Sequence, residues 1–367
     1  MFLPVLLVRD YGIGGWIAFA IPNIVGAAAM GWVLRRPGSS ELILAEHRAA
    51  CVAFSIVTLT FHAFFLIWLV GAVIPLSFCL TAVALVLVLT QFRPKDRSID
   101  LILSWVVLSV SLVILAKGLT NFHVADHHHP EQTGDLLYLT PICFFGFLLC
   151  PYLDVTFLEA RAANTPGGAK VAFGVGFGLF FLAMIILPLL YEGDFVQWGG
   201  IDDGSFGESG LRTWVALFLI CQTGFTWAAH RRALPAHQKS DLPMWIGAVA
   251  VVVVVTILLK RPASFNTLDA SGRLGEPIYR IFMSFYGLVF PAYVWICMTP
   301  IKGRSPGASR RALIVWAAAV VIAAPMYWMA FLQGKMAWLA PALIVVLGMR
   351  GLVSIGNSGN YRPRPAS

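Results

Sequence analysis

A carboxylate follows a proline at the end of an apolar run, in the segment CFFGFLLCPYLDVTFLEAR (Cys143 to Arg161). Pro151 lacks a backbone N–H, so Cys150 and Pro151 should end or kink the apolar helix. Asp154 then lies in the first turn of a second helical piece, where the helix dipole favours a carboxylate. Asp154 is therefore interpreted as a helix start near the membrane interface, as an intramembrane carboxylate that binds a cation or proton, or as a partner of a cytoplasmic arginine.

His62, in LTFHAFFLIW, is the one histidine that lies well inside a predicted span. Imidazole titrates near neutral pH, so His62 is a candidate proton relay. The alternative is an interior histidine that only completes local hydrogen bonds. Because no second histidine lies well inside a span, we expect no haem pair and no other cofactor.

Polar side chains also interrupt other apolar runs. AIPNIVGAAAMG combines the helix breaker Pro22 with an amide, and its small residues Ala27 to Ala29 and Gly31 permit close helix packing. CQTGFTW places an amide and two hydroxyls in a later run. Arg280 lies near the outer end of its run and is expected to extend towards the interface. The predicted substrate-binding residues are Pro22, Asn23, Thr140, Tyr152, Asp154, Gln222, Thr223 and Thr226.

The loop HVADHHHPEQTGD (residues 123–135) gathers histidines and carboxylates, which are ligand types for divalent metals. Three adjacent histidines on one loop give poor tetrahedral geometry, so a solvated outer loop is the expectation and no metal site is predicted. The chain has no GxSxG, P-loop, HExxH or CxxC motif. We therefore do not expect an enzyme, although an intramembrane enzyme stays an alternative.

These residues must be positioned by membrane helices. Of the 367 residues 59% are hydrophobic and 12% are charged, and the mean hydropathy is +0.80. A soluble domain would carry about 25% charged residues, so an all-α polytopic membrane protein is predicted. Residues 1–350 should form one transmembrane domain and residues 351–367 a polar cytoplasmic tail. The eleven predicted spans are 13–34, 49–70, 72–91, 99–118, 136–157, 170–191, 212–230, 243–259, 277–299, 311–332 and 336–350.

The net charge of +8 does not indicate a nucleic-acid partner, because the Lys and Arg residues lie in short clusters between apolar runs. Every second loop is basic, as at Arg35 and Arg36, at Arg231 and Arg232, and in the carboxyl-terminal tail. The positive-inside rule therefore places the amino terminus outside and the carboxyl terminus in the cytoplasm, in the cell membrane.

The Pro-interrupted first span, the pattern of later spans and the segment CPYLDVTFLEARAAN (Cys150 to Asn164) resemble the sodium:solute symporter branch of the amino acid–polyamine–organocation superfamily, which has a LeuT-like fold. In that branch a broken helix ends at the cytoplasm and leads into a short aromatic, Arg-bearing segment. The resemblance implies that span 136–157 matches the sixth core helix, span 13–34 the second, and that the first is missing, with MFLPVLLVRDYG as its remnant. The segment lacks the Gln-Arg pattern of the family, and Thr223 and Thr226 are not the adjacent Ser/Thr pair of its eighth core helix.

The resemblance implies a secondary-transporter-like protein that moves a small solute by alternating access, driven by an ion gradient. Its site would lie between spans 13–34, 136–157 and 212–230. A second hypothesis is a non-catalytic membrane scaffold or anchoring subunit that binds a protein partner. A cavity that reaches Asn23 or Asp154 would favour transport, whereas dry packing at both residues would favour a scaffold.

Overall fold

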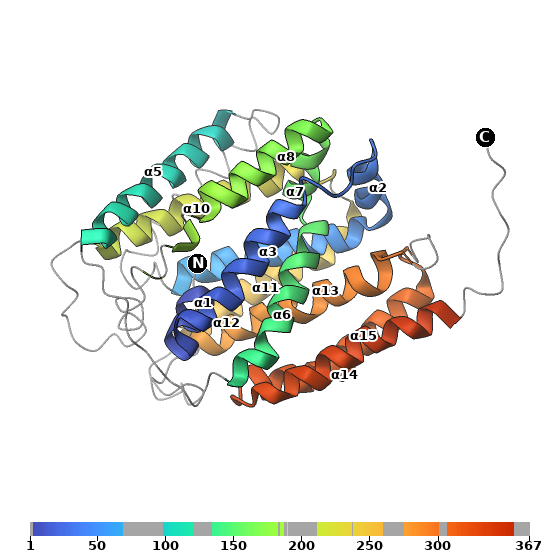
Figure 1. Ribbon diagram of the computed structural model, residues 1–367. Helices are drawn as coiled ribbons and strands as arrows, with labels where there is room; N and C mark the ends of the chain where they lie inside the picture. Colours follow the sequence, from blue (N-terminus) through green and yellow to red (C-terminus); the bar gives the residue numbers. More distant parts are fainter. Residues whose placement is uncertain are drawn as a thin grey trace.

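The structure is a computed structural model in which every element among the described residues is helical (Figure 1). The described residues are 3–68, 98–120, 134–182, 184–186, 189, 211–236, 238–259, 275–300 and 307–355. Span 72–91, the histidines of the loop 123–135 and residues 356–367 of the predicted tail lie outside them. The last described helix continues to Ile355, past the predicted end of the span at residue 350.

Eight helices of fourteen residues or more make up most of the bundle. They are α1 (Leu3–Ala29), α3 (Arg48–Trp68), α5 (Ser98–Thr120), α6 (Leu136–Leu149), α10 (Leu211–Ala233), α11 (Leu242–Leu259), α14 (Arg310–Phe331) and α15 (Leu339–Ile355). Shorter ones are α2 (Ser39–Glu46), α7 (Val155–Ala162), α8 (Pro166–Val175), α12 (Gly275–Ser284) and α13 (Phe290–Tyr293). In the described part of the chain, seven helical segments are long and apolar enough to cross a membrane, or eight if one bent pair counts as a span. The chain is thus a helical, multi-pass membrane protein.

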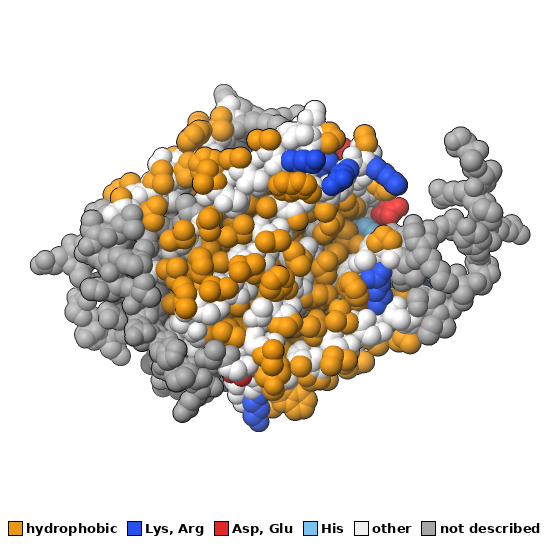
Figure 2. All heavy atoms as spheres, viewed as in Figure 1, with side chains coloured by type: hydrophobic (Ala, Val, Ile, Leu, Met, Phe, Trp, Pro, Cys, Tyr) orange, Lys and Arg blue, Asp and Glu red, His pale blue; other side chains and the backbone are white. Residues whose placement is uncertain are grey.

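The outer surface supports this conclusion. On α1, Ile13, Ile17, Ile21 and Val25 are each 44 to 54% exposed, and their four-residue spacing places them on one face of the helix. Figure 2 shows hydrophobic side chains across the middle of the visible face, whereas most Lys and Arg side chains lie at the end that carries α2 and α8. An apolar band with charges at its end is the surface that a bilayer requires.

The first helix differs from the sequence prediction. The expected break at Pro22 is wrong, because α1 continues through Pro22 to Ala29. The interruption lies instead at Gly12, whose φ of 62° and ψ of −152° depart from helical geometry. A glycine adopts positive φ without the steric cost that a Cβ imposes. The segment before Gly12 packs in the core, since Val5 to Val8 are at most 5% exposed.

The predicted break at Cys150 and Pro151 is confirmed. Helix α6 ends at Leu149, a 3₁₀ turn η3 (Cys150–Tyr152) follows, and α7 starts at Val155. The pair bends by 55° at this point. Proline and the capping residue act on backbone groups within a few positions, so local sequence was sufficient to locate this break.

The helix around Pro291 is irregular, although it continues as one span from Gly275 to Met298. Helix α12 is followed by the π-helical segment η7 (Phe285–Val289), by α13, and by a second π segment, η8 (Val294–Met298). Pro291 has no N–H for the carbonyls of the preceding turn. The Tyr327 hydroxyl donates to the Gly287 carbonyl at 2.7 Å, and the Cys150 thiol donates to the Tyr286 carbonyl at 3.4 Å. Side chains of α14 and η3 thus replace the missing backbone donor.

Replacing Tyr327 with phenylalanine is expected to destabilise the protein by about 1 kcal/mol, because the Gly287 carbonyl would lose its donor inside the bundle. The thermal unfolding midpoint of the purified protein in detergent measures the effect. Tyr138→Phe is the matched control, since the Tyr138 hydroxyl makes no hydrogen bond to the described residues. Equal midpoints for the two variants would contradict the role assigned to Tyr327.

Candidate functional site

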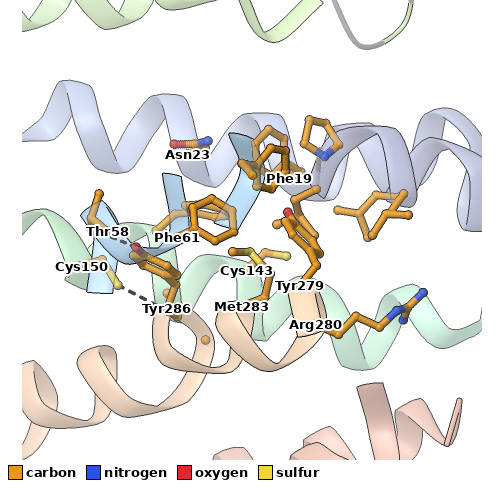
Figure 3. Close-up of a pocket in the computed structure, with 18 of the residues that line it drawn as sticks. Phe19, Asn23, Thr58, Phe61, Cys143, Cys150, Tyr279, Arg280, Met283 and Tyr286 are labelled. Atoms are coloured by element: carbon orange, nitrogen blue, oxygen red, sulfur yellow. Dashed lines mark hydrogen bonds between the residues drawn. The ribbon is translucent and has the colours of Figure 1, made fainter. Parts of the chain in front are cut away.

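A cavity of about 430 Å³ lies inside the bundle, with walls from α1, α3, α6, α10, α12 and η7. Figure 3 shows Phe19 and Asn23 of α1 across from Tyr279, Met283 and Tyr286. Most of its lining is apolar, with aromatic rings prominent. Lining aromatic residues are Tyr11, Phe19, Phe54, Phe61, Phe65, Phe147, Phe181, Phe218, Tyr279, Tyr286 and Phe331.

The cavity brings together most of the polar residues that the sequence singled out. Asn23, His62, Asp154, Gln222 and Thr223 all line it, although they come from four separate segments of the chain. Thr226 lies directly behind this wall, 3.4 Å from His62. Pro22, Thr140 and Tyr152 are not among the lining residues; Pro22 is buried and the other two are half-buried.

Asp154 has the first of its three predicted roles, the helix start. It is the N-cap of α7, and its Oδ1 accepts hydrogen bonds from the Thr156 backbone N–H at 2.8 Å and from the Thr156 hydroxyl at 2.7 Å. The same side chain lines the cavity. Within the described residues, no ion pair with an arginine forms and no hydrogen bond reaches Oδ2. One carboxylate oxygen therefore starts a helix, and the other has no protein partner there.

A polar seam joins α3 to α10: Ser55 and His62 of α3 face Thr226 and His230 of α10, and the Thr58 carbonyl and Gln222 complete it. His62 Nδ1 lies 2.8 Å from the Thr58 carbonyl, which can only accept, so Nδ1 carries the proton. In the neutral imidazole, Nε2 must then accept, and it faces the Thr226 hydroxyl at 3.4 Å. Gln222 in turn donates to Thr226 at 3.3 Å. The hydrogen bonds of the seam therefore fix the tautomer of His62.

Sequence reasoning missed His230 as a partner in this seam. His230 is 3% exposed, and its Nδ1 lies 3.1 Å from the hydroxyl of the fully buried Ser55. The signal was present in α10, because Gln222, Thr226 and His230 recur every four residues and so share one face. On α3 the matching positions are Ser55, Thr58 and His62.

A four-residue charge network occupies the opposite end of the cavity from Asp154, around Asp10 and Arg280. Arg9 makes two 2.9 Å hydrogen bonds to the Glu276 carboxylate and one of 2.6 Å to Asp10. Arg280 binds Glu276 at 2.6 Å and Asp10 at 3.2 Å. Arg280, which was expected to extend towards the interface, is thus held by two carboxylates, and its side chain is 21% exposed. Two positive and two negative charges leave this end of the cavity electrically balanced.

The opposite end of the bundle carries separate ion pairs. Arg232 binds Glu159 at 3.1 Å, which fastens α10 to α7. Arg48 binds Asp241 at 2.7 Å, which fastens α3 to the turn η5 (Lys239–Asp241) before α11. Basic residues of loops that are distant in the sequence therefore meet at one end, near α2.

The described residues contain no group of three or more His, Cys, Asp or Glu side chains that could hold a metal ion. Their five cysteines are free: Cys51, Cys143, Cys150 and Cys297 are buried and Cys221 is half-buried, whereas Cys79 lies outside the described residues. In the described part of the chain, Asn23, Asp154 and residues of the polar seam thus lie around one apolar cavity. Comparisons with protein-family models, with curated proteins and with solved structures found no match to this chain.

Proposed function

We propose that this protein is a secondary-transporter-like membrane protein that moves a small solute by alternating access. The observation that carries the proposal is the meeting of three helix irregularities at one cavity. Asp10 and Tyr11 precede the Gly12 interruption, Tyr286 and Gly287 belong to η7, and Cys150 and Asp154 flank the α6–α7 break. Interrupted helices beside a central site are the usual construction of secondary transporters.

The interruptions matter because they give a helix two parts that can move separately. A continuous α-helix is stiff, whereas a bend at Gly12 or at Cys150 lets one half tilt while the other stays packed. Such tilting would open the cavity on one side of the membrane and close it on the other. The same breaks support the proposed relation to the sodium:solute symporters, in which α6 and α7 would form the broken sixth core helix of a LeuT-like fold.

The remaining parts of the proposal concern the ion and the orientation. His62 is the proposed proton relay, because its hydrogen bonds through the polar seam connect α3 with α10 at the cavity wall. We also propose that the protein lies in the cell membrane with its carboxyl terminus in the cytoplasm. The gathering of basic residues at the end of the bundle near α2 supports this orientation.

The native Cys143 lines the cavity and offers a direct test. A variant is prepared in which Cys143 is kept and the other five cysteines are replaced with serine, which preserves a donor at position 150. A membrane-impermeant thiol reagent is then added to either side of oriented vesicles. Alternating access predicts that Cys143 reacts with reagent added to either side of the membrane. When one conformation is favoured, the rate of labelling from one side should rise and the rate from the other side should fall.

A second variant that keeps only Cys51 is the matched control. Cys51 is fully buried in the core beyond the cavity lining, so it should not react from either side. Reaction of Cys143 from one side alone, or from neither, would contradict transport and favour a scaffold that binds a protein partner. Those outcomes would also leave the cavity as a binding site without passage.

A further inference from the structure

We propose that Asp154 binds the ammonium group of an amphipathic organic cation, whose apolar part occupies the aromatic section of the cavity. This assignment names the class of solute that the protein would carry. That the solute is transported rests on the proposed function. Binding at Asp154 is a separate property, because a cavity can hold such a ligand without carrying it across the membrane.

The charges around the cavity lead to a cation. Among the described lining residues the carboxylates are Asp10 and Asp154, and the arginine is Arg280. Asp10 already has two arginine partners, whereas Asp154 uses Oδ1 to cap α7 and has no described partner at Oδ2. An ionised carboxylate beside apolar walls needs stabilising partners; the Thr156 donors supply them at Oδ1, and a positive group at Oδ2 would add to them. Asp154 is therefore the place where this cavity can accept one positive charge.

The oxygen atoms near Asp154 favour an organic cation over a metal ion. Hard metal ions need about six oxygen ligands. Here the Thr58 hydroxyl is already hydrogen-bonded to the Tyr286 hydroxyl at 2.9 Å, and the Tyr286 carbonyl accepts from the Cys150 thiol at 3.4 Å. These oxygens are already engaged, and the described residues contain no group of three or more His, Cys, Asp or Glu side chains for a metal ion. An ammonium group needs only one carboxylate together with ring faces.

Aromatic rings supply the rest of the proposed site. The Tyr286 ring lies 5.6 Å from the Phe54 ring and 6.3 Å from the Phe61 ring, and all three residues line the cavity. Asp154 lines the same cavity, four residues after Cys150, whose thiol donates to the Tyr286 carbonyl at 3.4 Å. A cation that sits over aromatic faces gains roughly 0.5–2 kcal/mol per contact. The apolar walls beyond Phe61 suit a hydrocarbon or aromatic body.

Other titratable groups near Asp154 are Cys51, Cys150, Tyr286 and His230. His230 is the one among them that becomes a cation when protonated, and that form would compete with a bound ammonium. Histidine has an ordinary pKa of about 6.5, so an assay at about pH 8 keeps this competitor neutral.

The test is equilibrium binding of tritiated benzyltrimethylammonium to the full-length protein in lipid nanodiscs at about pH 8. We expect saturable binding to the wild type and an affinity at least about tenfold weaker for Asp154→Asn, because the charge partner in the cavity is lost. Asparagine is also a good N-cap, so the start of α7 should survive the substitution. Neopentylbenzene, the uncharged carbon analogue of the probe, should not compete.

Glu159→Gln is the matched control, since Glu159 is a carboxylate on α7 that binds Arg232 outside the cavity. It should leave the affinity unchanged. The assignment would be overturned if the wild type did not bind the probe, or if Asp154→Asn bound it with unchanged affinity. It would also be overturned if neopentylbenzene or sodium ions competed as strongly as the unlabelled probe. Two-sided labelling of Cys143 without probe binding would overturn this inference alone. Probe binding with one-sided labelling would overturn transport alone.

Discussion

Replacing Gly26 with valine is expected to separate α1 from α6 and to leave little folded protein. A Cβ at Gly26 would meet the Phe147 carbonyl oxygen and carbon, and the Leu148 Cα lies 3.2 Å away. These are backbone atoms of α6, which cannot rotate away as a side chain can. The helices would have to move apart, so we expect a loss of about 3 kcal/mol or more.

The loss extends along the whole contact between the two helices. Phe19 of α1 packs edge-on against Phe147 with ring centroids 5.1 Å apart, and Ala20 and Ala27 are at most 4% exposed. Without a hydrophobic driving force between helices in lipid, close packing at small residues supplies much of the association energy. A shift of α1 would therefore also displace Asn23 from the cavity wall.

The fraction of monodisperse protein after detergent extraction and the thermal unfolding midpoint measure the effect. Gly247→Val is the matched control, because a Cβ at Gly247 of α11 meets no atom within 4 Å. Gly26→Ala should fall between the wild type and Gly26→Val. Normal yield and midpoint for Gly26→Val would contradict the close approach of α1 and α6.

Replacing Arg280 with glutamine is expected to destabilise the protein by about 2–3 kcal/mol, since two carboxylates would then share one arginine. The Arg280, Asp10 and Glu276 side chains are only 21 to 25% exposed. Water therefore screens the remaining repulsion incompletely, although the partial exposure keeps the loss below that of a fully buried pair. The loss should also loosen the contact with α14, because Arg280 donates to the Phe331 carbonyl at 3.3 Å.

A double-mutant cycle separates the pairwise interaction from other effects of the substitution. Glu276→Gln added to Arg280→Gln removes the excess negative charge, so the double variant should recover about half of the lost stability. Lys335→Gln, on the exposed turn between α14 and α15, is the control and should change the midpoint little. Full additivity of the two substitutions would contradict a coupled network.

Local features of the sequence were sufficient for the class of protein and for one helix break. Low charge and long apolar runs predicted membrane helices, and the described structure has seven or eight helical segments that can cross a membrane. The Cys150–Pro151 break and the start of a helix at Asp154 were also predicted. Proline geometry and N-capping involve atoms within about four residues, so their outcome depends little on the rest of the fold.

The same local rule failed at Pro22. A proline inside a helix costs one hydrogen bond, but neighbouring helices in a membrane can compensate, so the helix can continue. Whether it bends depends on how both of its sides pack, and the sequence of α1 alone does not contain that information. Gly12 bends instead, because glycine permits the required φ.

The sequence by itself therefore determined that the chain is a membrane protein, where its apolar helices lie and which of those helices carry polar residues. Only the tertiary structure decided which of those residues meet. Arg9 and Glu276 are 267 positions apart, and His62 and Thr226 are 164 apart. Such contacts depend on the rotation and crossing of whole helices, which are set by the sum of many weak packing interactions rather than by any local pattern. Asp154 became a candidate binding group for the same reason: its neighbours across the cavity belong to other helices.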